Sequence, residues 1–502
     1  MKTKPIDLLK ERLLEIAHLE TLLKLSKWDQ EVMMPKNASD SRAVAVSLLS
    51  GIIHGKFLAI ERDGLLNELK KEADSKSIKG KDAIIIKEVF KQIERKKKLP
   101  ESFVRELSEA ASKSQNAWAQ ARKDNNFKAF LPWLTKIVEL KKKEAELVGY
   151  KDSSYDALLD EYEPGMTTKE VEAVLQDLKS FLIPYLQKIK ESKVKVNTKK
   201  LLGKFSIPEQ YEFNKYVSEK IGFDFNSGRL DISTHPFTES PHMQDVRITT
   251  RYKENDLMYA LGSTIHETGH ALYEQGLPEK HFGTPLAEYI SLGIHESQSR
   301  LWENMFGKSI EFWKFFYPKV QKEFPSPYKS IKLEEFYRII NKVSPSFIRT
   351  EADEVTYNLH IIIRFEIEKE IMEGHINLKD LPTIWSAKVK EYLGVDVPDD
   401  SLGVLQDVHW SIGAFGYFPT YALGNLYSAQ IFAIMKREMP NMEKKMAKGE
   451  FTEAGEWLKK NIHSLGRTYS SGELIKKVTG EKLNSSYFIE YIEKKYKDLY
   501  TL

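Results

Sequence analysis

The chain has 502 residues, which is enough for two or three ordinary domains or for one large helical body. Its 76 Lys and Arg nearly balance its 73 Asp and Glu, so the formal net charge is only +3 and we expect no electrostatic binding of nucleic acid. The chain contains no cysteine, which excludes disulfides and thiolate metal sites and fits a reducing compartment.

Targeting signals are not expected in this sequence. Charged residues recur throughout residues 6–24, where a secretory signal would need an uninterrupted apolar core. No stretch approaches the roughly 18 apolar residues that a membrane helix needs. We therefore expect a cytoplasmic protein with no membrane partner.

Most of the chain has the apolar spacing of amphipathic helices. In residues 6–23 the apolar side chains recur close to a 3.6-residue period. Pro132 is placed at a helix start and Gly149 at the end of the same helix. Further helices are predicted over residues 168–189, 208–221, 255–273, 285–306 and 349–372, and over much of the C-terminal third. The segment 188–204 is the best internal boundary.

The helical period disappears between residues 222 and 254, where Gly, Ser, Pro and Thr become common. Within this region Val246, Ile248, Thr250 and Tyr252 alternate with polar residues, which predicts a strand. Residues 229–233 are a candidate partner for it. We therefore expect a small sheet packed against the helix over residues 255–273.

The main motif is His266-Glu267-Thr268-Gly269-His270, an H-E-x-x-H. Residues four apart lie on one face of a helix, so both imidazoles can reach one metal ion. Glu267 is rotated by about 100° and can contact a water molecule, whose proton a carboxylate can accept. Six of the 12 histidines lie within about 60 residues, which is more clustering than core packing requires. The pattern predicts a zinc site in which Glu267 activates water.

A catalytic zinc takes three protein ligands and keeps one position open. Position 276 is Gly, so no third His follows at the spacing of metzincin peptidases. The third ligand is therefore expected on the run 285–306, where spacing leaves Glu288, His295 and Glu296 open, with Glu296 and Glu288 as the main rivals.

At this point the chain resembles a known family, the carboxypeptidase Taq family of metallocarboxypeptidases. The resemblance spans nearly the whole chain. It rests on several motifs in order, which are His235-Pro236-Phe237, Asp245-Val246-Arg247-Ile248-Thr249, the H-E-x-x-H, His295-Glu296-Ser297-Gln298, Ile348-Arg349-Thr350-Glu351-Ala352-Asp353 and Gly403-Val404-Leu405-Gln406-Asp407-Val408-His409-Trp410. Two earlier segments, residues 28–31 and 155–165, also resemble the family.

The resemblance implies a mainly α, dome-like single domain over residues 1–502, with a long groove and the small sheet beside the metal-site helix. Helices of about residues 1–190 would form one wall or lid of the groove, and residues 205–502 would carry the metal site and the substrate-binding body. It also implies release of single amino acids from peptide C-termini with broad specificity, homodimers, and one zinc ion per chain that cobalt can replace. The third metal ligand is then Glu296.

Roles for further residues also come from the resemblance. Arg349 matches the position that recognises the terminal carboxylate, for which a planar guanidinium is suited, whereas a lone helical Arg would more often pair with Glu351 or Asp353. Arg247 is the second candidate. Donors to the oxyanion of the tetrahedral intermediate are expected among aromatic residues at motif positions. Tyr421 is the preferred donor and His409 the second, and His235 and Tyr417 are further candidates.

Two other classes of protein are compatible with the H-E-x-x-H alone. A zinc endopeptidase or oligopeptidase would use the same chemistry in a helical groove and would also cleave C-terminally amidated peptides. A helical scaffold with a structural zinc would need a fourth protein ligand, and the sequence offers none near His270 or Glu296.

Overall fold

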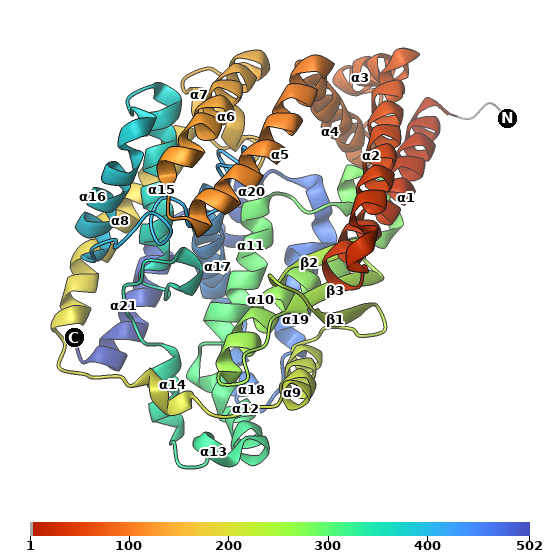
Figure 1. The fold of residues 1–502 in the computed structure, drawn as a ribbon. Helices are drawn as coiled ribbons and strands as arrows, with labels where there is room; N and C mark the ends of the chain where they lie inside the picture. The colour runs from red at the N-terminus through yellow and green to blue at the C-terminus, as the bar shows by residue number, and fades with distance from the viewer. Residues whose placement is uncertain (1–3) are drawn as a thin grey trace.

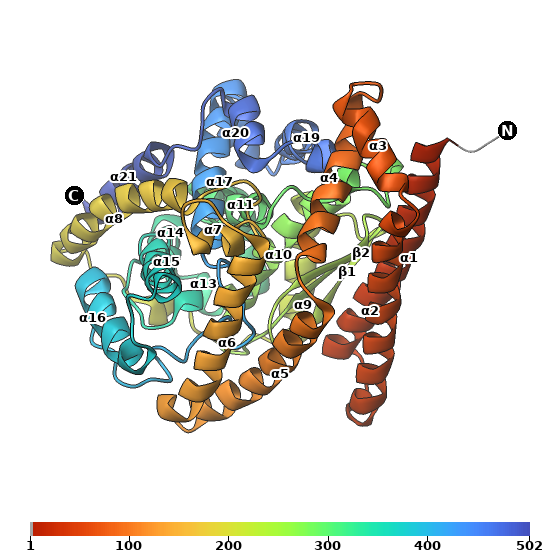
Figure 2. The same ribbon diagram turned by 90° about the horizontal axis from the view of Figure 1, so that it is seen from above.

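The computed structural model describes residues 4–502, and its N-terminal helices have a hydrophobic core of their own. These helices are α1 (Pro5–Val32), α2 (Ser39–Arg62), α3 (Leu65–Asp74) and α4 (Gly80–Lys97). The side chain of Leu286, from a later segment of the chain, joins their core. Helix α1 also contacts the small sheet. Figures 1 and 2 show these helices as a wall on one side of the molecule.

Helix α2 has an exposed apolar face. Val44, Leu48 and Ile52 lie four residues apart and are 70%, 66% and 43% exposed. By length and composition alone, the helical stretch Lys36–Arg62 could cross a membrane. This stretch contradicts the expectation that no segment is long and apolar enough to cross a membrane. A single such helix is weak support for a membrane span.

The next helices join the large core that extends to the C-terminus. They are α5 (Glu101–Lys123), α6 (Phe127–Val148), α7 (Ser154–Leu159) and α8 (Thr168–Glu191). The prediction that Pro132 begins a helix is wrong, because Pro132 lies inside α6. The helix begins earlier because the side chain of Asn126 accepts the N–H of Ala129 and caps it. Pro132 is exposed, so water can reach the carbonyl group that loses its partner.

A three-stranded sheet follows α9 (Ile207–Lys220). Strands β1 (Gly228–Ile232) and β3 (Asp245–Thr250) pair in parallel, with Arg229 opposite Arg247, and β2 (Thr238–His242) pairs antiparallel with β3. The order β1-β3-β2 leaves β2 at an edge. The two strands that the sequence predicts are confirmed, and β2 is additional.

The centre of the molecule holds the helices that carry the histidines of the H-E-x-x-H motif and His295 (Figure 1). These are α10 (Leu257–Gly276), which packs against β2 and β3, and α11 (Leu292–Arg300), which continues as a π-helical segment over Leu301–Phe306. The predicted single helix over 285–306 is wrong in its first part, where Pro285–Ala287 forms a short 3-10 turn and Ser291 caps α11. Because of this break, Glu288 lies outside α11, the helix that carries Glu296.

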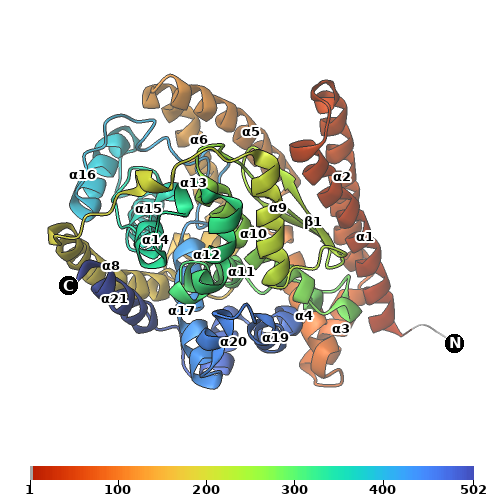
Figure 3. The ribbon, with the colours of Figure 1, turned by 90° about the horizontal axis from the view of Figure 1, so that it is seen from below.

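The remaining helices surround α10 and α11 (Figures 1 and 3). They are α12 (Ile310–Glu323), α13 (Pro325–Tyr328), α14 (Leu333–Ile340), α15 (Tyr357–Glu373), α16 (Leu381–Leu393), α17 (Pro419–Glu438), α18 (Met442–Met446), α19 (Thr452–Asn461), α20 (Ser471–Thr479) and α21 (Ser486–Tyr500). The predicted helix over 349–372 begins only at Tyr357, because residues 349–351 form a separate 3-10 turn. The mainly helical fold with a small sheet beside α10 is confirmed.

Candidate metal centre

Helix α10 presents two histidines on the same face. Its start is fixed by Asp256, whose carboxylate accepts the N–H groups of Met258 and Tyr259. The apolar face of α10 is buried in the large core, so the opposite face turns its polar side chains toward a cavity. His266 and His270 lie one turn apart on that face, as the spacing predicts.

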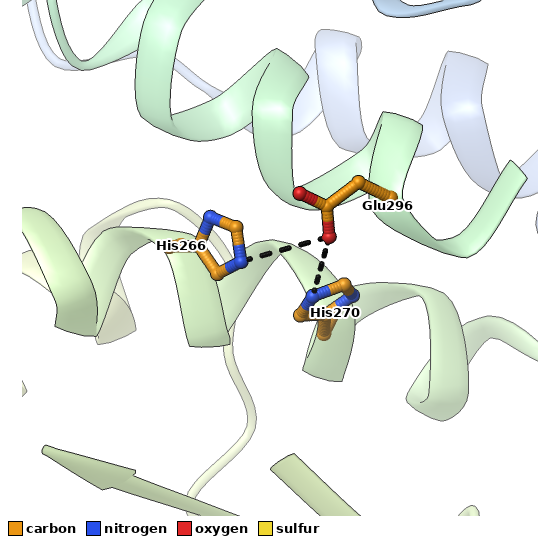
Figure 4. A group of neighbouring side chains, drawn as sticks. All are labelled: His266, His270 and Glu296. Atoms are coloured by element: carbon orange, nitrogen blue, oxygen red, sulfur yellow. Dashed lines mark ion pairs between the residues drawn. The ribbon is translucent and has the colours of Figure 1, made fainter. Parts of the chain in front are cut away.

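Glu296 on α11 points toward both imidazoles (Figure 4). Its Oε2 atom lies 3.4 Å from Nε2 of His270 and 3.8 Å from Nε2 of His266. The three ligand atoms all lie within 4.8 Å of one another. Glu288, the rival ligand, precedes α11 and pairs with Arg467 at 3.1 Å instead.

The chemistry of these donors fits a zinc-type ion. Ligand distances of about 2.0–2.2 Å put tetrahedral ligand atoms roughly 3.4 Å apart. The Oε2 atom of Glu296 lies at a similar distance, 3.4 and 3.8 Å, from the two imidazole nitrogens. Burial and the nearby His295 lower the pKa of His270 to about 3, so its imidazole is neutral and free to coordinate. Burial acts to raise the pKa of Glu296, but Arg300 and His266 outweigh it and the carboxyl is ionised.

Two charged residues on the same helical face support this group. Arg300 donates from Nε to Oε1 of Glu296 at 2.7 Å and from Nη1 to Oε2 of Glu303 at 3.2 Å. Glu303 in turn contacts Nδ1 of His266 at 2.7 Å. A hydrogen bond to the far nitrogen fixes both the tautomer and the orientation of a metal-binding imidazole.

Glu267 is buried in the same cavity and is held from the edge strand. Thr238 on β2 donates to Oε2 of Glu267 at 2.6 Å. Burial raises the pKa of Glu267, although His266 and the bond from Thr238 partly oppose this. A raised pKa brings a carboxylate closer to the range in which it accepts and returns protons efficiently.

Glycines allow the helices that carry these residues to approach closely. A Cβ atom on Gly269 of α10 would lie 2.6 Å from Cα of Ser299 on α11. One on Gly424 of α17 would lie 2.5 Å from Cγ of Glu296. The position of the third ligand relative to the histidines therefore depends on both glycines.

The Gly269→Ala protein is expected to be less stable than the wild type by about 1–3 kcal/mol, because α10 and α11 must separate to fit the methyl group. Urea unfolding measures the difference. Gly262→Ala is the matched control, since its Cβ would meet nothing within 4 Å on the same helix. That variant should gain up to about 1 kcal/mol from helix propensity. Equal stability of the two variants would contradict the packing argument.

The cavity at the metal-ligand group has a volume of about 890 Å³. Its lining includes His266, Glu267, His270 and Glu296. Other candidates from the sequence that line it are His235, His295, Arg349, Tyr417 and Tyr421. Arg247 and His409 do not line it.

Arg349 is buried in an unusual charge cluster. Its Nε and Nη2 atoms lie 3.2 and 3.1 Å from Oδ1 of Asp407, and Nη1 donates to the Tyr357 hydroxyl at 3.0 Å. Oδ2 of the same Asp407 accepts from Nε of Arg364 at 2.7 Å. Two guanidinium groups therefore share the carboxylate of Asp407, so these three side chains together carry one net positive charge. The pairings with Glu351 or Asp353 considered from the sequence do not occur.

His409 lies behind Tyr421. Its Nε2 atom is 3.3 Å from the Tyr421 hydroxyl, and the ring packs on Phe418 at 4.4 Å. Burial lowers the pKa of His409 to about 4, so the ring is neutral. In this position His409 can orient the Tyr421 hydroxyl, which lines the cavity.

Arg247 is held away from the cavity. Its guanidinium forms two hydrogen bonds with Asp245, at 2.7 and 3.0 Å, and lies over the Trp28 ring at 4.3 Å. Arg229 lies over the same ring at 4.9 Å. These contacts fasten α1 to the sheet. His235, by contrast, is exposed at the rim of the cavity.

The sequence reasoning did not single out several residues of the site. Arg300 and Glu303 follow Glu296 by four and seven positions, so helical periodicity could have found them. Glu274 follows His270 by four positions in the same way. Thr238 and Arg364 gave no such signal. The role of Thr238 depends on the pairing of β2 with its neighbouring strand, and that of Arg364 on the packing of α15, and the local sequence reveals neither.

A helical body that brings two histidines, a carboxylate as third candidate ligand and a second, buried Glu to one cavity has the site of a metallopeptidase. Residues 8–496 match the carboxypeptidase Taq (M32) metallopeptidase family. The chain is 40% identical to carboxypeptidase 1 of Bacillus subtilis over 99% of its own length and 98% of the relative's. It is 39% identical to thermostable carboxypeptidase 1 of Thermus thermophilus, over 97% of both.

A solved structure agrees with the sequence comparison. The M32 carboxypeptidase from Deinococcus radiodurans superposes with a TM-score of 0.94 at 36% identity and covers 99% of this chain and 100% of that one. The chain therefore belongs to the carboxypeptidase Taq (M32) metallopeptidase family. It is a metal-dependent carboxypeptidase, and the endopeptidase and scaffold alternatives are set aside.

Proposed function

We propose that the enzyme releases single amino acids from the free C-termini of peptides, with broad side-chain tolerance. The observation that supports this most is the position of Arg349. This residue lines the same cavity as His266, His270 and Glu296 and belongs to the cluster with one net positive charge. A substrate carboxylate would neutralise this positive charge.

We propose zinc as the ion, one per chain, with cobalt as a possible substitute. His266, His270 and Glu296 would hold it, and three protein ligands leave a position open for chemistry. When bound, such an ion supplies Lewis acidity, which polarises a carbonyl group and acidifies water. The donor set of two imidazoles and one carboxylate supports this choice.

In the proposed reaction, the side chains of the cavity divide the remaining work. Arg349 pairs with the terminal carboxylate and so places the last peptide bond beside Glu267. The Glu267 carboxylate accepts a proton from the attacking water and returns it to the leaving amine. The Tyr421 hydroxyl donates to the oxyanion, with His409 orienting it from behind. His235 contacts the substrate at the rim.

The proposal extends to the state of the protein in the cell. We propose that residues 1–502 act as one cytoplasmic peptidase domain in which the N-terminal helices form one wall of the groove, and that two chains form a homodimer. The exposed apolar face of α2 supports a partner surface on the protein. Sedimentation equilibrium, which reports the mass in solution, tests the dimer.

The metal-loaded protein is expected to remove residues one at a time from a free-acid peptide and to cleave the C-terminally amidated form of that peptide far more slowly. The reason is that an amide cannot form the charged pair with Arg349. Mass spectrometry of timed samples measures both, and a chelator should abolish the activity. Internal cleavage of both peptides would instead support endopeptidase chemistry at the same metal site.

A further inference from the structure

The two imidazoles of the metal-ligand group are supported in different ways. Nδ1 of His266 meets a carboxylate directly, at 2.7 Å from Oε2 of Glu303. Nδ1 of His270 meets another imidazole, at 2.6 Å from Nδ1 of His295. Nε2 of His295 then lies 2.8 Å from Oε1 of Glu274. A chain of two side chains, His295 and Glu274, therefore extends behind His270, whereas a single carboxylate lies behind His266.

The contacts allow one arrangement of hydrogens in this chain when the site holds an ion. Nε2 of His270 faces Glu296, and a nitrogen that binds a cation carries no hydrogen. Nδ1 of His270 must then carry the hydrogen and donate it to Nδ1 of His295. His295 in turn carries its own hydrogen on Nε2 and donates it to Glu274. Every ring nitrogen of the pair is used, and all donors point toward Glu274.

The ring of His295 has little freedom to move. Its plane lies at 26° to that of His270, with centroids 4.5 Å apart, and it packs against Tyr289 at 4.8 Å. Tyr273 packs on it at 5.4 Å. The side chains of His295 and Glu274 are 14% and 12% exposed. A ring confined in this way can hold its neighbour in one orientation.

We propose that His295 and Glu274 form a positioning relay for the metal ligand His270. The relay fixes the tautomer and orientation of His270, and it passes the electron-donating effect of the Glu274 carboxylate to the metal-binding nitrogen. His295 adjoins the ligand Glu296 on α11, and Glu274 follows His270 by one turn on α10. The relay therefore also links the two helices that carry the ligands. This inference rests on the proposed metal site.

The relay makes a specific prediction for metal affinity. Glu274→Gln and His295→Leu should each weaken zinc binding by about 10–100-fold, the usual effect of losing such an outer partner. His295→Gln should fall between His295→Leu and the wild type, since its amide can accept from His270 and donate to Glu274. The dissociation constant is measured by competition with a chromophoric chelator.

Glu239→Gln provides the matched control. Glu239 lines the same cavity and is also a Glu, but no hydrogen bond or ion pair joins it to His270, His295 or Glu274. Its replacement should leave zinc affinity close to the wild-type value. The melting temperature of each chelator-stripped variant shows whether the fold is retained, and ¹⁵N NMR of the histidines reports whether His270 keeps a single tautomer.

The outcomes separate the relay from the metal site itself. If the wild type binds no zinc, the proposed metal site fails. If the wild type binds zinc and Glu274→Gln and His295→Leu bind it equally well, or no worse than Glu239→Gln, the relay is overturned. Two zinc ions per wild-type chain, with one lost in His295→Leu, would show that His295 is a ligand of a second ion and would also overturn it.

Discussion

Replacement of Glu267 by Gln is expected to lower kcat by about 10²–10⁴-fold while zinc affinity stays close to that of the wild type. Gln has the same shape and can keep its contact with Thr238, but it cannot accept a proton from water. Glu267 is not one of the three atoms that converge in the metal-ligand group, so the metal site should survive. Steady-state kinetics on a free-acid peptide and zinc content of the purified variant measure the two effects.

Thr238→Val tests the same residue from the side of the sheet. The variant loses the hydrogen bond to Glu267 but keeps the carboxylate, so the loss in kcat should be smaller than for Glu267→Gln. That bond acts to lower the pKa of Glu267, so its removal raises the pKa further. A base must be ionised to act, and the acidic limb of the pH profile of kcat/KM should therefore move to higher pH.

A Glu267→Gln enzyme with normal turnover would remove Glu267 from the proposed mechanism.

The proximity of His266 and His270, the two candidate metal ligands, could be predicted because the information for it is local. A spacing of four on one amphipathic helix is enough to bring His266 and His270 together. The third ligand was different, since spacing alone left Glu288 and Glu296 open. The choice depends on the break before Ser291, which puts Glu288 outside α11 and beside Arg467.

The edge strand β2 could not be predicted from its own sequence. Residues 238–242 include a Pro and show no alternation of apolar and polar side chains. The strand forms because β3 offers a free edge and α1 and α10 cover it. Thr238 reaches Glu267 only as a result of that pairing, so its role was equally hidden.

The surroundings of Arg349 and Arg247 were decided by tertiary packing as well. Both are motif residues with no local sign of which one reaches the cavity. Arg247 is held by Asp245 and Trp28, which are near in space because α1 lies on the sheet. Arg349 is held by Asp407, 58 positions further along the chain.

Arg349→Met is expected to lower kcat/KM for free-acid peptides by about 10²-fold or more, which is the usual effect of removing one partner of a buried charge pair. Hydrolysis of the amidated peptide, already slow, should change little. The ratio of the two kcat/KM values is the measurement. The variant should still fold, because Asp407 keeps its hydrogen bond with Arg364 and no buried charge loses its partner.

Arg247→Gln is the control for Arg349, because both are arginines of the family-like motifs and only Arg349 lines the cavity. It should leave the ratio of free-acid to amide hydrolysis unchanged. A larger loss for Arg247→Gln than for Arg349→Met would transfer carboxylate recognition to Arg247. Equal losses on the two peptides in Arg349→Met would show that Arg349 supports the cavity without reading the C-terminus. We expect the selective loss in Arg349→Met, because Arg349 and Arg364 share the single carboxylate of Asp407 and these three side chains together carry a net positive charge that a substrate carboxylate can balance.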